Sequence, residues 1–163
     1  MITIQISEAL ELPEGLPAIP ADSPLLPAME AAALAACRRA GPPDEVDLTV
    51  VLADDRQLQA LNNQFLGIDA PTDVLSFPDG EVDPDSERVY LGDVLISYPR
   101  AAAQAAAGGH ALQAELQLLV VHGVLHLCGH DHADEDQQQR MWAVQAAALG
   151  DVACEISGPK AAA

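Results

Sequence analysis

The 163-residue chain has few basic residues and contains no long apolar run. Its 7 Lys plus Arg stand against 25 Asp plus Glu, which gives a formal net charge of −18. Nucleic-acid-binding proteins typically present a basic face, so the charge by itself favours an acidic enzyme without a nucleic-acid substrate. No apolar segment is long enough to span a bilayer, and the first residues lack the basic and apolar regions of a secretion signal.

Cysteine is also scarce. Cys37, Cys128 and Cys154 are widely separated, which does not suggest a disulfide framework and favours a reducing compartment. We therefore expect a cytoplasmic protein that has no membrane partner. The length and the 50% hydrophobic content are sufficient for one domain with a single core.

Apolar periodicity predicts four strands and five helices without strict alternation, which favours an α+β fold with a mixed sheet. Pro78 should end an edge strand, Pro27 should occupy the first helical position, and Phe65 should share a helix face with Leu58 and Leu61. A single hydrolase domain is expected over residues 1–157, with a disordered tail at 158–163. The expected strands are 1–7, 46–53, 73–77 and 89–97, and the expected helices are 27–40, 55–66, 99–107, 111–128 and 133–149.

The segment HGVLHLCGHDH, residues 122–132, contains four of the five histidines of the chain. His122 and His126 are four residues apart, so both rings lie on one face of a helix, with Cβ atoms about 5–6 Å apart. Gly129 is a natural helix stop, and the following turn can bring His132 back towards the same ion. The spacing predicts one metal ion held by three imidazoles, with a fourth position left open. Zinc is the default, although nickel, copper and iron also accept imidazole ligands.

The same register of histidines and glycine occurs in the HExxHxxGxxH signature of metzincin peptidases. In that signature a Glu after the first histidine is the general base, whereas Gly123 stands here, which counts against a peptidase. A structural zinc site would need a fourth protein ligand, and neither Cys128 nor His130 lies in a suitable register. Asp131 and Asp93 are candidates for orienting a histidine, with a helix cap as the alternative for Asp131; no catalytic residue is assigned.

HGVLHLCGHDH, PTDVLSFP at 71–78 and LGDVLIS at 91–97 together resemble the YbeY family of bacterial metal-dependent endoribonucleases, or ribosomal RNA maturation factors. The resemblance spans most of residues 46–150. It implies a zincin-like metal site with zinc held by His122, His126 and His132, and cleavage of single-stranded RNA. It also implies a role in maturation of small-subunit ribosomal RNA and in ribosome quality control, with RNA and the small ribosomal subunit as partners and no DNA.

One departure from the family pattern concerns the substrate. The family commonly has an Arg just before the Gly that leads into PTDVLSFP, and Leu66 stands at that position here. Another arginine, such as Arg100, could replace it. Three hypotheses remain: a metal-dependent endoribonuclease, a zinc peptidase, and a ribosome-binding assembly factor whose zinc is mainly structural. The three motifs are more specific than the net charge, so the endoribonuclease is favoured.

Overall fold

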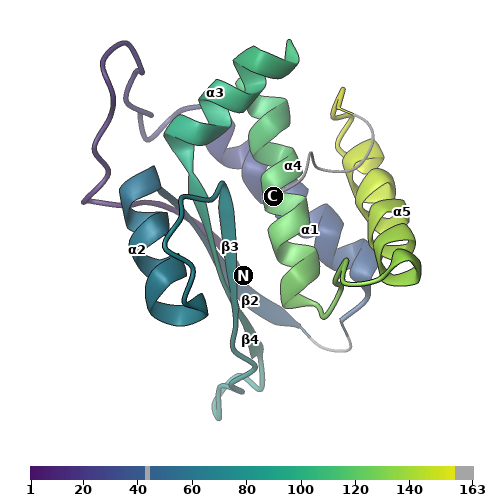
Figure 1. Cartoon of the computed structure of the whole chain (residues 1–163). Helices are drawn as coiled ribbons and strands as arrows, with labels where there is room; N and C mark the ends of the chain where they lie inside the picture. The colour runs from purple at the N-terminus through teal and green to yellow at the C-terminus, as the bar shows by residue number, and fades with distance from the viewer. Residues whose placement is uncertain (43–44, 157–163) are drawn as a thin grey trace.

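The computed structural model describes residues 1–42 and 45–156, which form a single α+β domain with a four-stranded mixed sheet (Figure 1). The tail expected at 158–163 lies outside the described residues. The strands are β1 (Ile2–Ile6), β2 (Val46–Ala53), β3 (Val74–Pro78) and β4 (Val89–Ser97). The helices are α1 (Leu25–Ala40), α2 (Asp55–Leu66), α3 (Tyr98–Gly108), α4 (Leu112–Leu127) and α5 (Glu135–Asp151).

The sheet has the order β1-β2-β4-β3. β1, β2 and β4 are parallel, whereas β3 runs antiparallel to β4 and forms one edge. Pro78 is the last residue of β3, so a residue without a backbone N–H lies at the end of this edge strand. The edge strand predicted at 73–77 is therefore confirmed.

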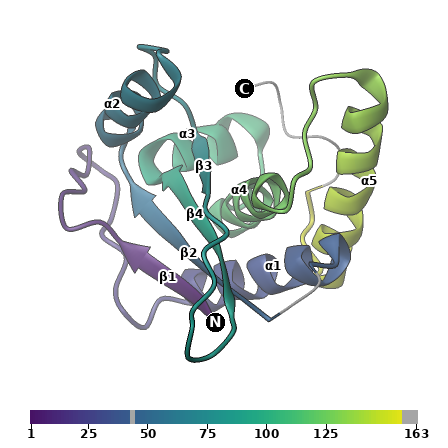
Figure 2. The same cartoon turned by 90° about the horizontal axis from the view of Figure 1, so that it is seen from below.

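The helices form layers on the two faces of the sheet. α1 and α4 pack together on one face, α5 contacts both of them from outside, and α2 lies on the other face (Figures 1 and 2). The main core fills the space between β2, β4 and the α1–α4 layer. None of the helices among residues 1–42 and 45–156 combines the length and apolar character needed to cross a membrane.

Two helix starts differ from the sequence prediction by two residues. α1 begins at Leu25, which places Pro27 in the first turn but not at the first position. Proline is tolerated there because the first N–H groups of a helix have no intrahelical acceptor. α5 begins at Glu135, and its cap is Asp134, whose side chain accepts a hydrogen bond from the Gln137 backbone N–H at 2.8 Å.

Candidate metal centre

The central helix α4 carries the first two histidines of the cluster. Most of its residues are buried because it lies between the sheet and the helices α1, α3 and α5. A helix that is apolar on all sides is typical of such a position. His122 is buried and His126 is half-buried, both in the last two turns. The helix thus fixes two imidazoles on a rigid element.

A tight turn after α4 brings the third histidine back. The Gly129 N–H donates to the His126 carbonyl at 3.1 Å, and the His130 N–H donates to the Leu125 carbonyl at 3.0 Å. This pair of bonds is a Schellman motif. Gly129 has φ +93°, a left-handed conformation that favours glycine. The chain therefore reverses at the predicted residue, and His132 follows on the cleft side of the turn.

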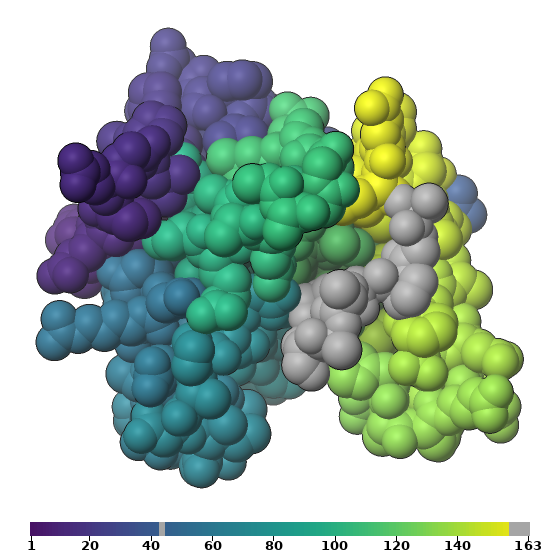
Figure 3. Space-filling model, turned by 45° about the horizontal axis from the view of Figure 1, so that its top comes forward, coloured from purple at the N-terminus to yellow at the C-terminus, as the bar shows by residue number. Residues whose placement is uncertain are grey.

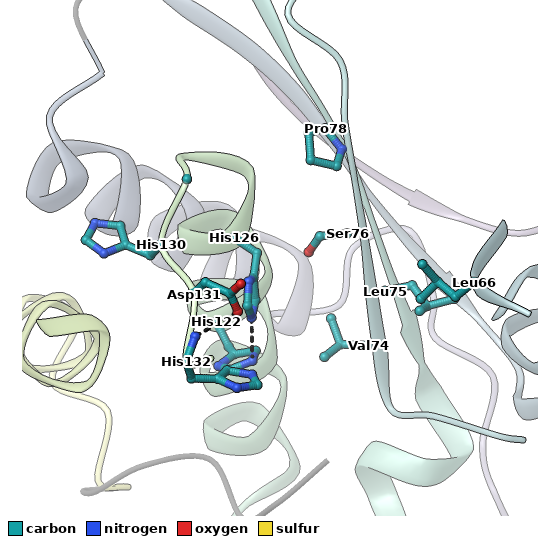
Figure 4. A pocket seen from close by; sticks show the side chains of 11 residues that line it. Leu66, Val74, Leu75, Ser76, Pro78, His122, His126, His130, Asp131 and His132 are labelled. Carbon is teal, nitrogen blue, oxygen red and sulfur yellow. Dashed lines mark hydrogen bonds between the residues drawn. The ribbon is translucent and has the colours of Figure 1, made fainter. Parts of the chain in front are cut away.

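The rings of His122, His126 and His132 converge (Figure 4). One nitrogen from each ring lies within 4.8 Å of the other two. The Nε2 atoms of His122 and His126 are 3.2 Å apart, close to the ~3.3 Å between two tetrahedral ligands that are bonded at about 2.0–2.1 Å. The arrangement therefore suits one small transition-metal ion, and His132, which is exposed, leaves the solvent side of the cluster open.

Gln145 of α5 fixes the orientation of His122. Its Oε1 lies 3.1 Å from His122 Nδ1, and the Gln145 side chain is fully buried. Because an amide oxygen only accepts, Nδ1 carries the proton in the neutral ring, and Nε2 keeps its lone pair for the centre of the cluster. Sequence reasoning missed Gln145. The signal in the sequence that could have identified Gln145 is a polar residue on the same helix face as the apolar Met141 and Ala148.

The cluster forms one wall of an open cleft of about 400 Å³. The other wall is the end of α2 and the edge strand β3, and it is mostly apolar (Figure 4). In the space-filling view a notch separates the teal surface of this region from the yellow-green start of α5 (Figure 3). The lining consists of Leu66, Val74, Leu75, Ser76, Pro78, His122, His126, Gly129, His130, Asp131 and His132.

Among the residues that the structure describes, no Lys or Arg lines the cleft. Leu66 is at the cleft, 60% exposed, where the family pattern has its Arg. Arg100 does not replace that cation. Its guanidinium makes two hydrogen bonds of 2.9 Å to the Asp55 carboxylate, and Arg100 is not part of the cleft lining.

Gly123, at the position of the missing peptidase Glu, faces the sheet. A Cβ atom added at this residue would lie 2.5 Å from Val94 Cγ1 and 3.3 Å from Ser76 Oγ. The Ser76 hydroxyl also donates a 2.9 Å hydrogen bond to the Gly123 carbonyl, which joins β3 to α4. The absence of a side chain at Gly123 therefore allows α4 to pack closely against the sheet.

The other candidate residues are not members of the three-histidine cluster. His130 points away from the three rings (Figure 4), and burial raises the pKa of the Cys128 thiol to about 11, which disfavours the thiolate needed for a metal ligand. Asp131 accepts a 2.7 Å hydrogen bond from the His132 backbone N–H. Asp93 accepts from the Tyr90 hydroxyl and is not part of the cleft lining, so its predicted role in orienting a histidine gains no support. Asp131 is not the cap of α5 either.

Comparison with known proteins gives a consistent result. A family model described as Endoribonuclease YbeY matches residues 23–153. The Endoribonuclease YbeY of Chloroflexus aurantiacus is 47% identical over 129 residues, which covers 76% of this chain and 79% of the relative. The protein of the same name from Acidothermus cellulolyticus is 43% identical over 112 residues, covering 63% and 68%.

The fold is also similar to a solved structure. A solution structure of a protein from Thermotoga maritima aligns with a TM-score of 0.53, covering 99% of this chain and 100% of the other. The two sequences are 24% identical, so this similarity concerns the fold alone.

Proposed function

The chain belongs to the YbeY endoribonuclease family, and from this membership we propose that it is a metal-dependent hydrolase that cleaves single-stranded RNA. The observation that carries the proposal is the convergence of three histidines in an open cleft inside the matched region. We further propose that residues 1–157 act as one functional domain in the cytoplasm. The substrate would be ribosomal RNA of the small subunit, during maturation and quality control of the ribosome.

We propose one zinc ion per chain, held by His122, His126 and His132. Three nitrogen ligands with an open side are typical of catalytic zinc, whereas structural zinc usually has four protein ligands. When bound, the metal would polarise a phosphoryl oxygen and lower the pKa of water. The protein residues supply the geometry: α4 fixes two rings, the turn at Gly129 returns the third, and Gln145 sets the tautomer of His122.

Replacing Gln145 by leucine should weaken metal binding about 10- to 100-fold, because the His122 N–H loses its buried acceptor and the ring is no longer oriented. Gln145→Glu keeps an acceptor at the same position and should retain most of the affinity. Competition with a zinc chelator of known affinity measures both variants. Wild-type affinity in Gln145→Leu would contradict the assigned role.

Gly123 counts against the peptidase alternative, since this position offers no space for a general base near the histidines. The lack of a cation in the described lining gives some weight to the third hypothesis, an assembly factor. Such a factor would bind ribosomal RNA or ribosomal subunits without cutting the strand.

The deciding experiment incubates the zinc-loaded protein with single-stranded RNA, double-stranded RNA and casein, with and without chelator. We expect cleavage of single-stranded RNA alone, its loss with chelator, and its return when zinc is added back. A His126→Ala preparation purified in the same way controls for a contaminating nuclease. Cleavage of casein would favour the peptidase, and chelator-insensitive RNA binding without cleavage would favour the assembly factor.

A further inference from the structure

The end of α2 exposes apolar side chains at the rim of the cleft. Phe65 is 58% exposed, Leu66 60% and Ile68 52%, although they lie within four residues of one another. Leu66 also lines the cleft itself. Clustered exposed apolar residues beside a cavity commonly mark a binding surface. We refer to Phe65, Leu66 and Ile68 as the apolar rim.

An aromatic pair supports this rim. The rings of Phe65 and Phe77, the only two phenylalanines of the chain, meet edge to face with centroids 5.3 Å apart. Phe77 belongs to β3, the strand that forms the cleft wall opposite the histidines. The contact holds the Phe65 ring against β3, next to Leu66 in the sequence but outside the cleft lining itself, while more than half of the Phe65 surface remains accessible.

Electrostatic attraction offers little help to an RNA strand here. The guanidinium of Arg39 is paired with Asp151, and those of Arg88 and Arg100 are paired with carboxylates near β2 and the start of α2. Arg140 lines a separate hollow of about 320 Å³ on the other side of the turn at 129–131, next to Asp131. With a net charge of −18 and no Lys or Arg in the described part of the cleft lining, phosphate pairing should supply only a small part of the affinity for RNA.

We propose that the apolar rim is a stacking platform for one nucleobase of the RNA strand, with Phe65 as its principal contact. This inference rests on the proposed function and specifies how the substrate is held. Stacking on an aromatic ring accepts any base, because every base has a π-face. The rim is continuous with the cleft through Leu66, so a base on the rim would belong to the strand whose backbone passes the histidine wall.

A nucleobase suits the rim better than a protein partner does. A stable protein interface buries about 800 Å² on each side, whereas the rim consists of three side chains at one helix end. Phe65 also contributes little to the core. The packing of α2 depends on Leu58, which is fully buried, and its start is fixed by the Asp54–Gln57 capping box.

The test measures binding of a short, labelled 2′-O-methyl RNA to the zinc-loaded protein by fluorescence anisotropy, with a gel to show that the strand stays intact. Phe65→Ala should weaken binding about 5- to 100-fold, and Phe65→Trp should retain it. Val82 is also 58% exposed but lies in the connection between β3 and β4 rather than at the end of α2, so Val82→Ala should bind as the wild type does.

The salt dependence separates stacking from phosphate pairing. With one to three phosphate contacts, the wild-type slope of log affinity against log salt should be shallower than about −2. Phe65→Ala should lower affinity without changing that slope. Leu66→Arg serves as a positive control, because one added phosphate contact should steepen the slope by about 0.7.

A strand with one abasic nucleotide, moved along the sequence, locates the base. At one position the missing base should weaken binding to the wild type as much as Phe65→Ala does. The same abasic strand and the intact strand should then bind Phe65→Ala equally well. Wild-type affinity in Phe65→Ala, or a wild-type slope steeper than about −4, would overturn the stacking platform. Cleavage is scored separately: Phe65-dependent binding without cleavage would refute the nuclease alone, and cleavage unaffected by Phe65→Ala would refute the platform alone.

Discussion

His126→Ala is expected to lose bound metal and RNA cleavage together, whereas His130→Ala keeps both. Removal of one of three protein ligands should lower metal affinity by more than about 100-fold, since loss of a residue that only orients a ligand already costs 10- to 100-fold. His130 is four residues from His126 in the same segment, but its ring points away from the cluster (Figure 4). Elemental analysis of dialysed protein measures the metal content.

Thermal unfolding provides a second measurement that does not depend on activity. A metal that binds only the folded chain stabilises it by about 4 kcal/mol at 1,000 times its dissociation constant. Added zinc should therefore raise the melting temperature of the wild type and of His130→Ala, and should leave His126→Ala nearly unchanged. If His130→Ala lost as much metal as His126→Ala, the ligand assignment would be incorrect.

Local sequence patterns were sufficient to predict which segments form helices and which form strands. The β-branched and apolar runs of β2 and β4 predict strands with the observed bounds, 46–53 and 89–97. The spacing of histidines around Gly129 likewise predicts three rings near one another, because helix geometry and the turn are both local.

Features that depend on tertiary packing were not predictable in the same way. Phe65 follows Leu58 at helical spacing, yet it is exposed, because the small core under α2 contains Ala53, Leu58 and Leu75 and does not extend to the end of the helix. Periodicity identifies a helix face but does not show how far the opposing surface reaches. The contact between Gln145 and His122 joins α5 to α4, and no local pattern specifies it.

Gly123→Glu, which would restore the peptidase signature, is expected to destabilise the protein strongly without creating a peptidase. Position 123 is buried against β3 and β4, and even a Cβ atom would lie 2.5 Å from Val94 Cγ1. Val94 is fully buried and stiff at χ1, so it has little freedom to move aside. A carboxylate forced into this contact should cost about 3–5 kcal/mol or more, a large part of a typical stability of about 5–15 kcal/mol.

Gly123→Ala isolates the steric part of this effect. Overpacking should cost about 1–3 kcal/mol, and the higher helix propensity of alanine should return about 0.8–1.0 kcal/mol. We therefore expect a net loss of about 0–2 kcal/mol by denaturant titration. Gly150 is also helical but has nothing within 4 Å of an added Cβ, so Gly150→Ala should be neutral or slightly stabilising.

Val94→Ala should partly rescue Gly123→Ala, because removing the two valine methyl groups opens the space that the new Cβ needs. The double variant should therefore be more stable than the sum of the two single losses predicts, by about 0.5–3 kcal/mol. Additive losses, or a Gly123→Ala protein as stable as Gly150→Ala, would show that α4 can move away from the sheet. In that case close packing would not explain why this chain has glycine where the peptidases have their base.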